Sequence, residues 1–280
     1  MKYELKLVVK RILTYLAGKL NKTKIGRGLC KQIIDTAMDQ TIAVDHKRLQ
    51  MKFAVPNSLN RFRVKTFSTK EPETLEWIDG FNERAILWDI GANIGLYSVY
   101  AAKAKKCDVF AFEPSVFNLE LLARNIHLND QTDQICVIPI PLSDRMAKSK
   151  LNLISTEWGG ALSTFGRDFG WDGEPMNKVF SFQTLGLSMT DARKLLNLPQ
   201  PDYVKMDVDG LEHLILRGGK EILKDVKGVL VEINDDFLEQ KTESTMILQE
   251  AGLTMKEKRH GKMFENGIFQ NTYNQIWERI

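Results

Sequence analysis

Cysteine is scarce in this 280-residue chain, which contains only three. Cys30, Cys107 and Cys136 lie too far apart in the sequence to form a metal-binding pair, and they suggest no disulfide framework. Disulfide-poor chains are typical of reducing compartments, so we expect a cytoplasmic protein.

Long apolar runs are also missing. No stretch approaches the roughly 18 uninterrupted apolar residues of a membrane-spanning helix. Lysines interrupt the apolar patches near the N-terminus, so we expect no secretory signal. The remaining composition, 43% hydrophobic and 27% charged, is typical of a soluble globular protein. The length suits one large α/β domain or two small ones.

Positive charge is concentrated at one end of the chain. Residues 1–36 contain nine lysines and arginines against two acids, a balance of +7, whereas the net charge is only +3. The rest of the chain is therefore acidic, and we expect no nucleic-acid partner. Apolar residues recur every three or four positions from Leu5 to Leu20, which predicts an amphipathic helix. Such a helix can lie at the inner face of an anionic membrane, or pack on its own domain or on a second copy.

Two regions follow from this pattern, a basic helical extension over residues 1–47 and a main domain over residues 48–280. Residues 48–68 predict extended segments around a turn at Pro56. A helix then starts near Pro72, with Ser68 or Thr69 as its cap. From residue 85, short apolar strands alternate with helices of about 10–14 residues. This alternation predicts an α/β fold with a mostly parallel sheet, helices on both faces and a terminal antiparallel hairpin.

The segment "ILWDIGANIGLYS" (residues 86–98) predicts a strand, a tight turn at Gly91 and close helix packing at Gly95. Ligands of such sheets bind beyond the carboxyl ends of the strands. Asn93 occupies the place of the middle glycine in a dinucleotide fingerprint, so an NAD-type oxidoreductase is only an alternative. At the strand end, Asp89 would repel a pyrophosphate and favour a cationic ligand such as S-adenosylmethionine.

Two further strand ends carry candidate cofactor residues. Glu113 follows Gly91 by 22 positions, close to the spacing of an acid that accepts ribose hydroxyls. It could instead be an acid at the start of the next helix. Ser143 and Asp144 follow the third strand, where they either contact an adenine ring or form a polar turn.

Acidic residues also follow the fourth and fifth strands, and transfer of a methyl group to a hydroxyl requires a proton acceptor. Asp207, Glu212 and Glu232 are the predicted catalytic residues, and Asp207 also faces the cofactor. Asp209 fits the cap of the following helix better. Asp207 and Glu232 could together bind a divalent cation, although the chain offers few further ligands and this reading is not favoured.

The histidines and one glycine-rich loop are weaker candidates. His213 and His260 are secondary candidates for the base. The loop from Glu157 to Gly173 contains four large aromatic residues. It predicts either a sugar-binding surface or a lid held to the core by its aromatic rings.

Four segments together resemble one known family: "DIGANIGLYS", "AFEPSVFNLELLARNIHLN", "PLSD" and "VKMDVDGLEHLILRGG". They are similar to the FkbM family of S-adenosylmethionine-dependent methyltransferases, over about residues 53–260. The resemblance implies a class I methyltransferase (Rossmann-like) fold, with a seven-stranded, mostly parallel sheet whose last strand is antiparallel. It also implies O-methyl transfer, often to sugar hydroxyls of glycans or other metabolites. A non-catalytic cofactor-binding protein of the same fold is the second alternative.

The resemblance assigns roles to particular residues. It places Asp89, Gly91 and Asn93 at the methionine part of the cofactor, within a turn that includes Ala92 and Gly95. It places Glu113 at the ribose, and Ser143 and Asp144 beside the adenine. The chain departs from the family at "TLGLS", where Gly186 replaces the aspartate of a Leu-Asp pair.

Overall fold

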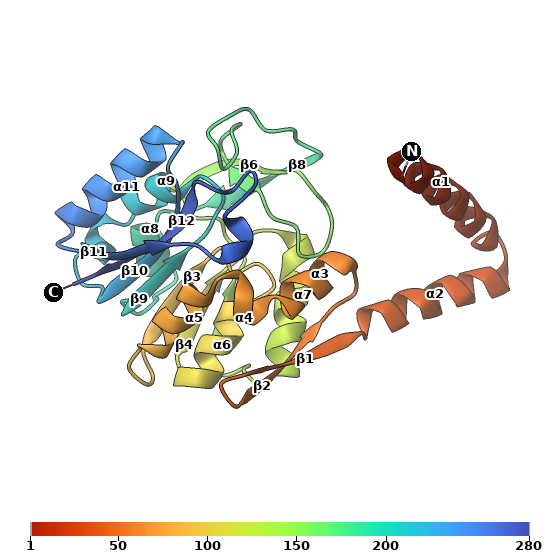
Figure 1. The fold of residues 1–280 in the computed structure, drawn as a ribbon, viewed down its shortest axis with the longest axis horizontal. Coiled ribbons are helices and arrows are strands. Elements are labelled where there is room, and N and C mark those ends of the chain that lie inside the picture. Colours follow the sequence, from red (N-terminus) through yellow and green to blue (C-terminus); the bar gives the residue numbers. More distant parts are fainter. Residues whose placement is uncertain (1, 280) are drawn as a thin grey trace.

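The computed structural model describes residues 2–279, and the side chains of residues 8–9 and 11–279. Two helices, α1 (Lys2–Leu20) and α2 (Lys24–Met38), form an arm that extends away from the rest of the chain (Figure 1). The predicted N-terminal helices are therefore present. The Thr23 hydroxyl accepts a hydrogen bond from the Gly26 N–H and caps α2 after the break between the helices.

The main domain is built on a seven-stranded sheet, in the order β11-β12-β10-β9-β3-β4-β5. Its strands are β3 (Ile86–Ile90), β4 (Asp108–Phe112), β5 (Ile135–Ile138), β9 (Tyr203–Met206), β10 (Gly228–Asn234), β11 (Thr254–Arg259) and β12 (Thr272–Glu278). β12 runs antiparallel to both of its neighbours, whereas the pairs from β10 to β5 are parallel. This confirms the predicted mostly parallel sheet with an antiparallel last strand.

Helices cover both faces of the sheet (Figure 1). One group is α5 (Pro72–Asp79), α6 (Leu96–Lys105) and α7 (Val116–Leu128). The other is α8 (Met189–Leu195), α9 (Glu212–Arg217), α10 (Lys220–Leu223) and α11 (Leu238–Glu250). Each group encloses its own apolar core, with Tyr100 buried in the first and Met206 in the second. The sheet is therefore buried on both faces. The residues directly after β3, β4, β9 and β10 come together at one edge of it, because these strands are parallel.

The segment before the sheet differs from its prediction. β1 (Thr41–His46) and β2 (Leu49–Ala54) form a hairpin that spans the predicted boundary at residue 47. The following residues are helical, as α3 (Ser58–Lys65) and α4 (Phe67–Lys70), so the predicted extended segment is wrong after Pro56. The Asn57 side chain accepts the Asn60 N–H and starts α3. Pro72 does open α5, but neither Ser68 nor Thr69 caps that helix.

An additional small sheet lies over one side of the domain. It consists of β6 (Ala147–Leu153), β7 (Ser163–Phe165) and β8 (Phe180–Gly186), in the order β7-β6-β8. Gly186 ends β8 directly beneath the Phe165 ring, and a Cβ atom at this glycine would lie 2.3 Å from a ring carbon. The departure at Gly186 therefore has a packing reason. A short 3₁₀ helix, η1 (Lys262–Phe264), connects β11 to β12.

Candidate active site

A cavity of about 310 Å³ opens at the carboxyl ends of β3, β9 and β10. Its lining includes the turn after β3 at Gly91, Asp207 and Asp209 after β9, and Glu232 within β10. The other lining residues are Leu59, Phe62, Arg63, Lys70, Glu71, Asn93, Ala161, Leu162, His260, Phe264, Phe269, Thr272 and Asn274. The cavity thus lies where ligands of open α/β sheets bind.

The glycine turn has the geometry that its sequence predicts. Gly91 has a φ of +84°, and a Cβ atom there would lie 1.9 Å from the Asp207 carbonyl oxygen. The Gly91 and Ala92 N–H groups both donate to the Phe112 carbonyl, which fixes the turn against β4. Gly95 has a φ of +80° and accommodates the Leu122 side chain of α7. Close approach of backbone and helix therefore explains both glycines.

Asp89 is paired with a cation that the sequence analysis did not consider. Asp89 on β3 and Lys205 on β9 are neighbours in the register of the two strands. The Lys205 ammonium lies 3.7 Å from the Asp89 carboxylate and 3.4 Å from Asp207. Asp89 is buried beneath the turn, where its other oxygen accepts the Ser98 hydroxyl. Lys205 offsets part of the negative charge of Asp89, so the prediction that Asp89 repels a pyrophosphate must count this cation as well.

Lys205 is almost fully buried, at 2% exposure. Burial by itself would lower its pKa, but the carboxylates of Asp207, Asp89 and Glu71 together raise the pKa of Lys205 above its ordinary value. The side chain is therefore a fixed positive charge beneath the cavity. A charged residue inside an apolar strand is the sequence feature that could have revealed it.

Glu113 lies beside the same turn, where it organises backbone. One of its carboxylate oxygens accepts the Asn93 N–H at 2.8 Å and the other accepts the Ser115 N–H at 2.7 Å. Burial raises the pKa of Glu113 to about 7, in spite of these donors. Both alternatives from the sequence are compatible with this geometry, because the carboxylate reaches the turn and also meets the start of α7.

Neither Ser143 nor Asp144 lines the main cavity. The Ser143 hydroxyl contacts Asp144, whose carboxylate faces Arg145, Arg167 and Arg217 at 3.6–4.0 Å. An apolar space instead adjoins Gly91, with a lining that includes Phe112, Pro114, Ile140, Pro141 and Leu142. The geometry therefore favours the polar-turn alternative for Ser143 and Asp144.

Three carboxylates meet at the main cavity. Asp207, Asp209 and Glu232 each place one oxygen within 4.8 Å of the others. Burial, with the nearby charge of Asp207, raises the pKa of Asp209 to about 6 and that of Glu232 well above its ordinary value. Asp209 does not cap α9, because its carboxylate accepts the Leu162 N–H at 2.6 Å. Such a cluster can retain a proton or accept one near neutral pH.

Glu212 does not reach the cavity, although the sequence analysis placed it among the catalytic residues. Its two oxygens accept the N–H groups of Val208 at 2.9 Å and Gly210 at 3.0 Å, and the Gln240 amide also donates to it. The side chain is fully buried. Glu212 therefore fixes the loop that carries Asp209 and acts as a positioning residue.

Replacing Glu212 with glutamine is expected to lower the free energy of unfolding by about 1–3 kcal/mol. The amide has one acceptor oxygen, so one of the two loop N–H groups loses its partner. Chemical denaturation measures the change, and Glu239→Gln on the exposed surface of α11 is the matched control. Equal stability of the two variants would show that Glu212 does not hold the loop.

The loop from Glu157 to Gly173 covers the glycine turn. The Gly160 carbonyl accepts the side-chain amides of Asn93 at 2.8 Å and Asn118 at 3.0 Å. From this loop, only Ala161 and Leu162 line the main cavity.

The aromatic residues of this loop pack elsewhere. Trp158 packs against the first core and Phe165 is buried in the second. Phe169 contacts Phe237, and Trp171 contacts Phe269. The geometry favours the lid held by aromatic packing over a sugar-binding surface on these four rings.

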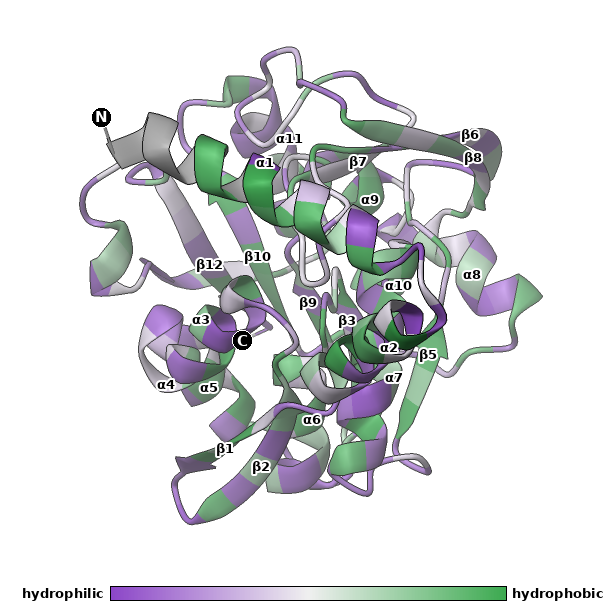
Figure 2. Ribbon diagram, turned by 90° about the vertical axis from the view of Figure 1, so that its right-hand side faces the viewer, coloured by the Kyte–Doolittle hydropathy of each residue, from purple (hydrophilic) through white to green (hydrophobic). Residues whose placement is uncertain are grey.

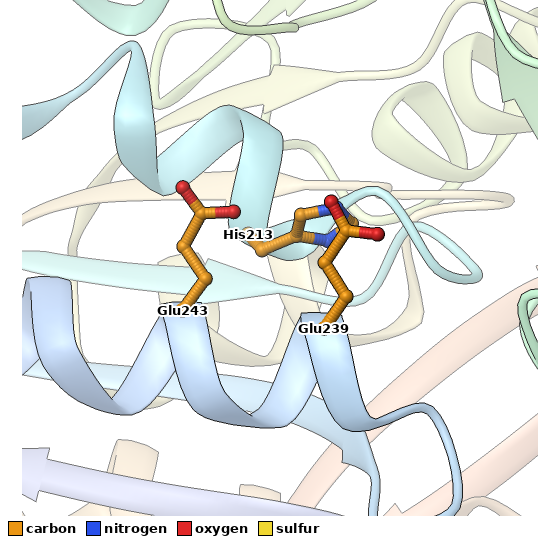
Figure 3. A group of neighbouring side chains, drawn as sticks. All are labelled: His213, Glu239 and Glu243. Atoms are coloured by element: carbon orange, nitrogen blue, oxygen red, sulfur yellow. The ribbon is translucent and has the colours of Figure 1, made fainter.

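The two candidate histidines differ in position. His260 lines the cavity and packs against Tyr273, so it remains beside the site. His213 lies on α9 and faces Glu239 and Glu243 of α11 (Figure 3), and it is not among the residues that line the cavity. Arg217 already binds both oxygens of Glu243, at 2.7 and 2.6 Å. His213 is therefore a weaker candidate for the base than His260.

Three charged cavity residues upstream of the sheet were not anticipated. Arg63 on α3, Lys70 at the end of α4 and Glu71 line the cavity next to the carboxylate cluster. Burial would raise the pKa of Glu71, but the charges of Lys70 and Lys205 lower it to about 2. The segment of Arg63 was predicted as extended chain, whereas Lys70 and Glu71 were expected near the start of the helix at Pro72. The helical cap at Asn57 is the sequence feature that could have indicated α3.

Comparisons with known proteins identify the family. Two solved methyltransferases are among the structures similar to this chain. One is an rRNA methylase from Streptococcus thermophilus, with 12% identity, 74% of this chain and 95% of that chain covered, and a TM-score of 0.45. Another is M. jannaschii TYW2 in complex with AdoMet, with 12% identity, 86% and 87% covered, and a TM-score of 0.41. The sequence pattern of the methyltransferase FkbM domain matches residues 89–260, and the chain belongs to this family.

A curated relative is the hexuronic acid methyltransferase AglP of Haloferax volcanii. It is 25% identical over 211 residues, which cover 72% of this chain and 77% of AglP. The resemblance seen in the sequence is therefore confirmed at the level of family and fold. The oxidoreductase and non-catalytic alternatives are not favoured.

Proposed function

We propose that this protein transfers a methyl group from S-adenosylmethionine to a hydroxyl of a sugar. One observation carries the proposal: Asp207, Asp209 and Glu232 converge on the cavity that Gly91 also lines. A sugar hydroxyl is a weak nucleophile and must lose its proton as the new bond forms. These carboxylates supply proton acceptors at that position.

The cofactor residues of the proposal are those of the glycine turn and its neighbours. Gly91, Ala92 and Asn93 would face the methionine part, and Glu113 would accept the ribose hydroxyls. The Glu113 carboxylate accepts hydrogen bonds from the backbone N–H groups of Asn93 and Ser115 and from the Asn118 side chain, and a carboxylate has about four acceptor sites, so one is left for a ligand. We place the adenine in the apolar space beside Pro114 and Ile140, in place of Ser143 and Asp144. Bound there, the cofactor would supply an activated methyl group on its sulfonium.

The charges of the cluster favour a hydroxyl over a carboxylate as the acceptor. A carboxylate acceptor needs no base and would be repelled by Asp207, Asp209 and Glu232. A hydroxyl is neutral, and its proton can pass to Glu232 or Asp209. The fixed charge of Lys205 at 3.4 Å from Asp207 offsets part of the negative charge. With Lys205 in that place, the cluster fits proton transfer better than it fits a divalent metal ion.

The rest of the cavity suits an acidic sugar. AglP is named for hexuronic acid, and the same substrate class would explain Arg63 and Lys70 in the lining. Lys70 already pairs with Glu71, so the Arg63 guanidinium would bind a sugar carboxylate while a hydroxyl faces Glu232. Phe62, Phe264 and Phe269 offer aromatic faces to the ring.

Binding of S-adenosylhomocysteine is expected to strengthen as pH rises from 6 to 8, by roughly tenfold at most. The pKa of Glu113 is raised to about 7, and its ionised form accepts ribose hydroxyls best. As the pH increases, the affinity should therefore increase until the pH passes the pKa of Glu113, and it should stay constant at higher pH. Calorimetry at several pH values measures the curve. The same curve in Glu113→Gln would remove Glu113 from the ribose site.

Calorimetry at pH 8 with S-adenosylhomocysteine also tests the cofactor assignment itself. We expect saturable binding to the wild-type protein, and weaker binding by Gly91→Ala because a methyl group would strike the Asp207 carbonyl. The control is Gly28→Ala on α2, where a Cβ atom meets nothing within 4 Å. Absence of wild-type binding at about 1 mM ligand, equivalent to roughly −4 kcal/mol, would contradict the assignment.

A further inference from the structure

The N-terminal arm carries an apolar surface that nothing in the described chain covers. Seven large apolar side chains of α1 are 47–61% exposed: Val8, Val9, Ile12, Leu13, Tyr15, Leu16 and Leu20. On α2, Ile25, Leu29 and Ile33 are 80%, 53% and 67% exposed. Leu5, which began the predicted repeat, lies outside the described side chains. Contiguous apolar surface of this kind marks an interaction site more often than scattered single residues do.

The arrangement of these residues is that of a binding face. Ile25, Leu29 and Ile33 are each four residues apart, so they form one stripe along α2. The arm extends beyond the main domain, and its ribbon has hydrophobic bands on both helices (Figures 1 and 2). Among the described side chains of the arm, Met38 in the last turn of α2 is the one that joins the domain core. The stripe is therefore available to an external partner.

The charge around this face is strongly positive. Described cations of the arm are Arg11, Lys19, Lys22, Lys24, Arg27 and Lys31, and Asp35 is the only acid among the described side chains of residues 8–36. None of these cations forms a salt bridge within the described part of the chain. The charge of the arm thus remains free for a negatively charged partner.

We propose that residues 1–36 dock this protein on an anionic lipid surface, with the apolar face of α1 and α2 in the headgroup region. Apolar area and adjacent basic residues are the two contributions that hold interfacial helices. A second copy of the arm would bring +7 against +7, so self-association through it is opposed by charge. No helix of the described residues is long and apolar enough to cross a membrane, so the arm would lie along the surface.

Vesicle flotation of the full chain tests the proposal. The probes are phosphatidylcholine vesicles with and without phosphatidylglycerol, at about 0.1 M and about 0.5 M salt, because salt screens exposed charges. We expect binding to the anionic vesicles at low salt, and roughly fivefold less at high salt or on phosphatidylcholine alone. The readout involves no methyl transfer, so it is independent of the proposed function.

Two variants separate the contributions. Ile25→Gln/Leu29→Gln/Ile33→Gln removes the stripe with residues that keep helix propensity, and Lys19→Gln/Lys22→Gln/Arg27→Gln removes charge. Each should reduce binding roughly fivefold or more. The matched control is Val179→Gln/Leu185→Gln, at two exposed apolar residues of the main domain. Equal flotation of all four proteins would overturn the proposal. A second outcome would also overturn it. In that outcome light scattering finds a wild-type dimer, the stripe variant is monomeric, and none of the proteins binds vesicles.

Discussion

Replacing Glu232 with glutamine is expected to lower the turnover number about 100- to 10,000-fold, the usual contribution of a general base. Glutamine has nearly the same shape but cannot accept the proton. The affinity for S-adenosylhomocysteine should change by less than about threefold, or roughly 0.6 kcal/mol, because Glu232 faces the acceptor in our proposal. Steady-state kinetics and calorimetry on the same protein measure the two quantities.

The Glu232 variant also distinguishes the two kinds of acceptor oxygen. If the methyl group went to a sugar carboxylate, no base would be needed, and removal of a negative charge would leave the rate unchanged or increase it. The matched control is Glu250→Gln at the exposed end of α11, which should retain wild-type turnover. An active Glu232→Gln enzyme would therefore contradict Glu232 as the proton acceptor, and activity that persists in Glu232→Gln/Asp209→Asn would favour carboxylate methylation.

Replacing Lys205 with methionine is expected to lower the free energy of unfolding by about 3–5 kcal/mol. Methionine fills a similar volume, but it leaves the buried Asp89 carboxylate without its countercharge. Asp207, 3.4 Å from the ammonium in the wild-type protein, also loses its neighbour. Chemical denaturation measures the loss. Cofactor affinity should fall as well, because the Asp207 carbonyl packs against Gly91 in the glycine turn.

Two further proteins test whether the buried pair causes this loss. Lys227→Met removes a lysine that is 51% exposed and bound to Asp202, and it should cost no more than about 1 kcal/mol. The double variant Asp89→Asn/Lys205→Met removes both charges and should recover part of the loss. Destabilisation by Lys205→Met no greater than that of Lys227→Met would show that Lys205 does not balance a buried charge.

The sheet was predictable because its strands are buried on both faces and therefore appear as short apolar runs. The alternation of strands with helices predicted that neighbouring strands run parallel. The two short segments after residue 253 predicted the antiparallel strands at the end of the chain. Residues 58–70 were not predictable from apolar spacing, because α3 and α4 depend on the Asn57 cap and on contacts with distant segments. The small sheet of β6, β7 and β8 likewise depends on pairing between distant strands.

Position along a strand predicted the site better than residue type did. Gly91, Asp207 and Glu232 are at the cavity because neighbouring parallel strands bring their carboxyl ends to one edge. The sequence could not show which carboxylates already form hydrogen bonds or salt bridges within the protein. Glu212 is held by backbone N–H groups and Asp144 by arginines, and both depend on contacts that form only in the folded chain.

Mass spectrometry with trideuteromethyl-labelled S-adenosylmethionine tests the central claim most directly. The purified protein would be incubated with uronate-containing and neutral glycan fractions, with Glu232→Gln as the inactive comparison. We predict one labelled methyl group on a sugar hydroxyl oxygen of the uronate fraction, sensitive to the Glu232 substitution. Label on nitrogen, on a sugar carboxylate, or on no glycan despite saturated cofactor binding would contradict the account.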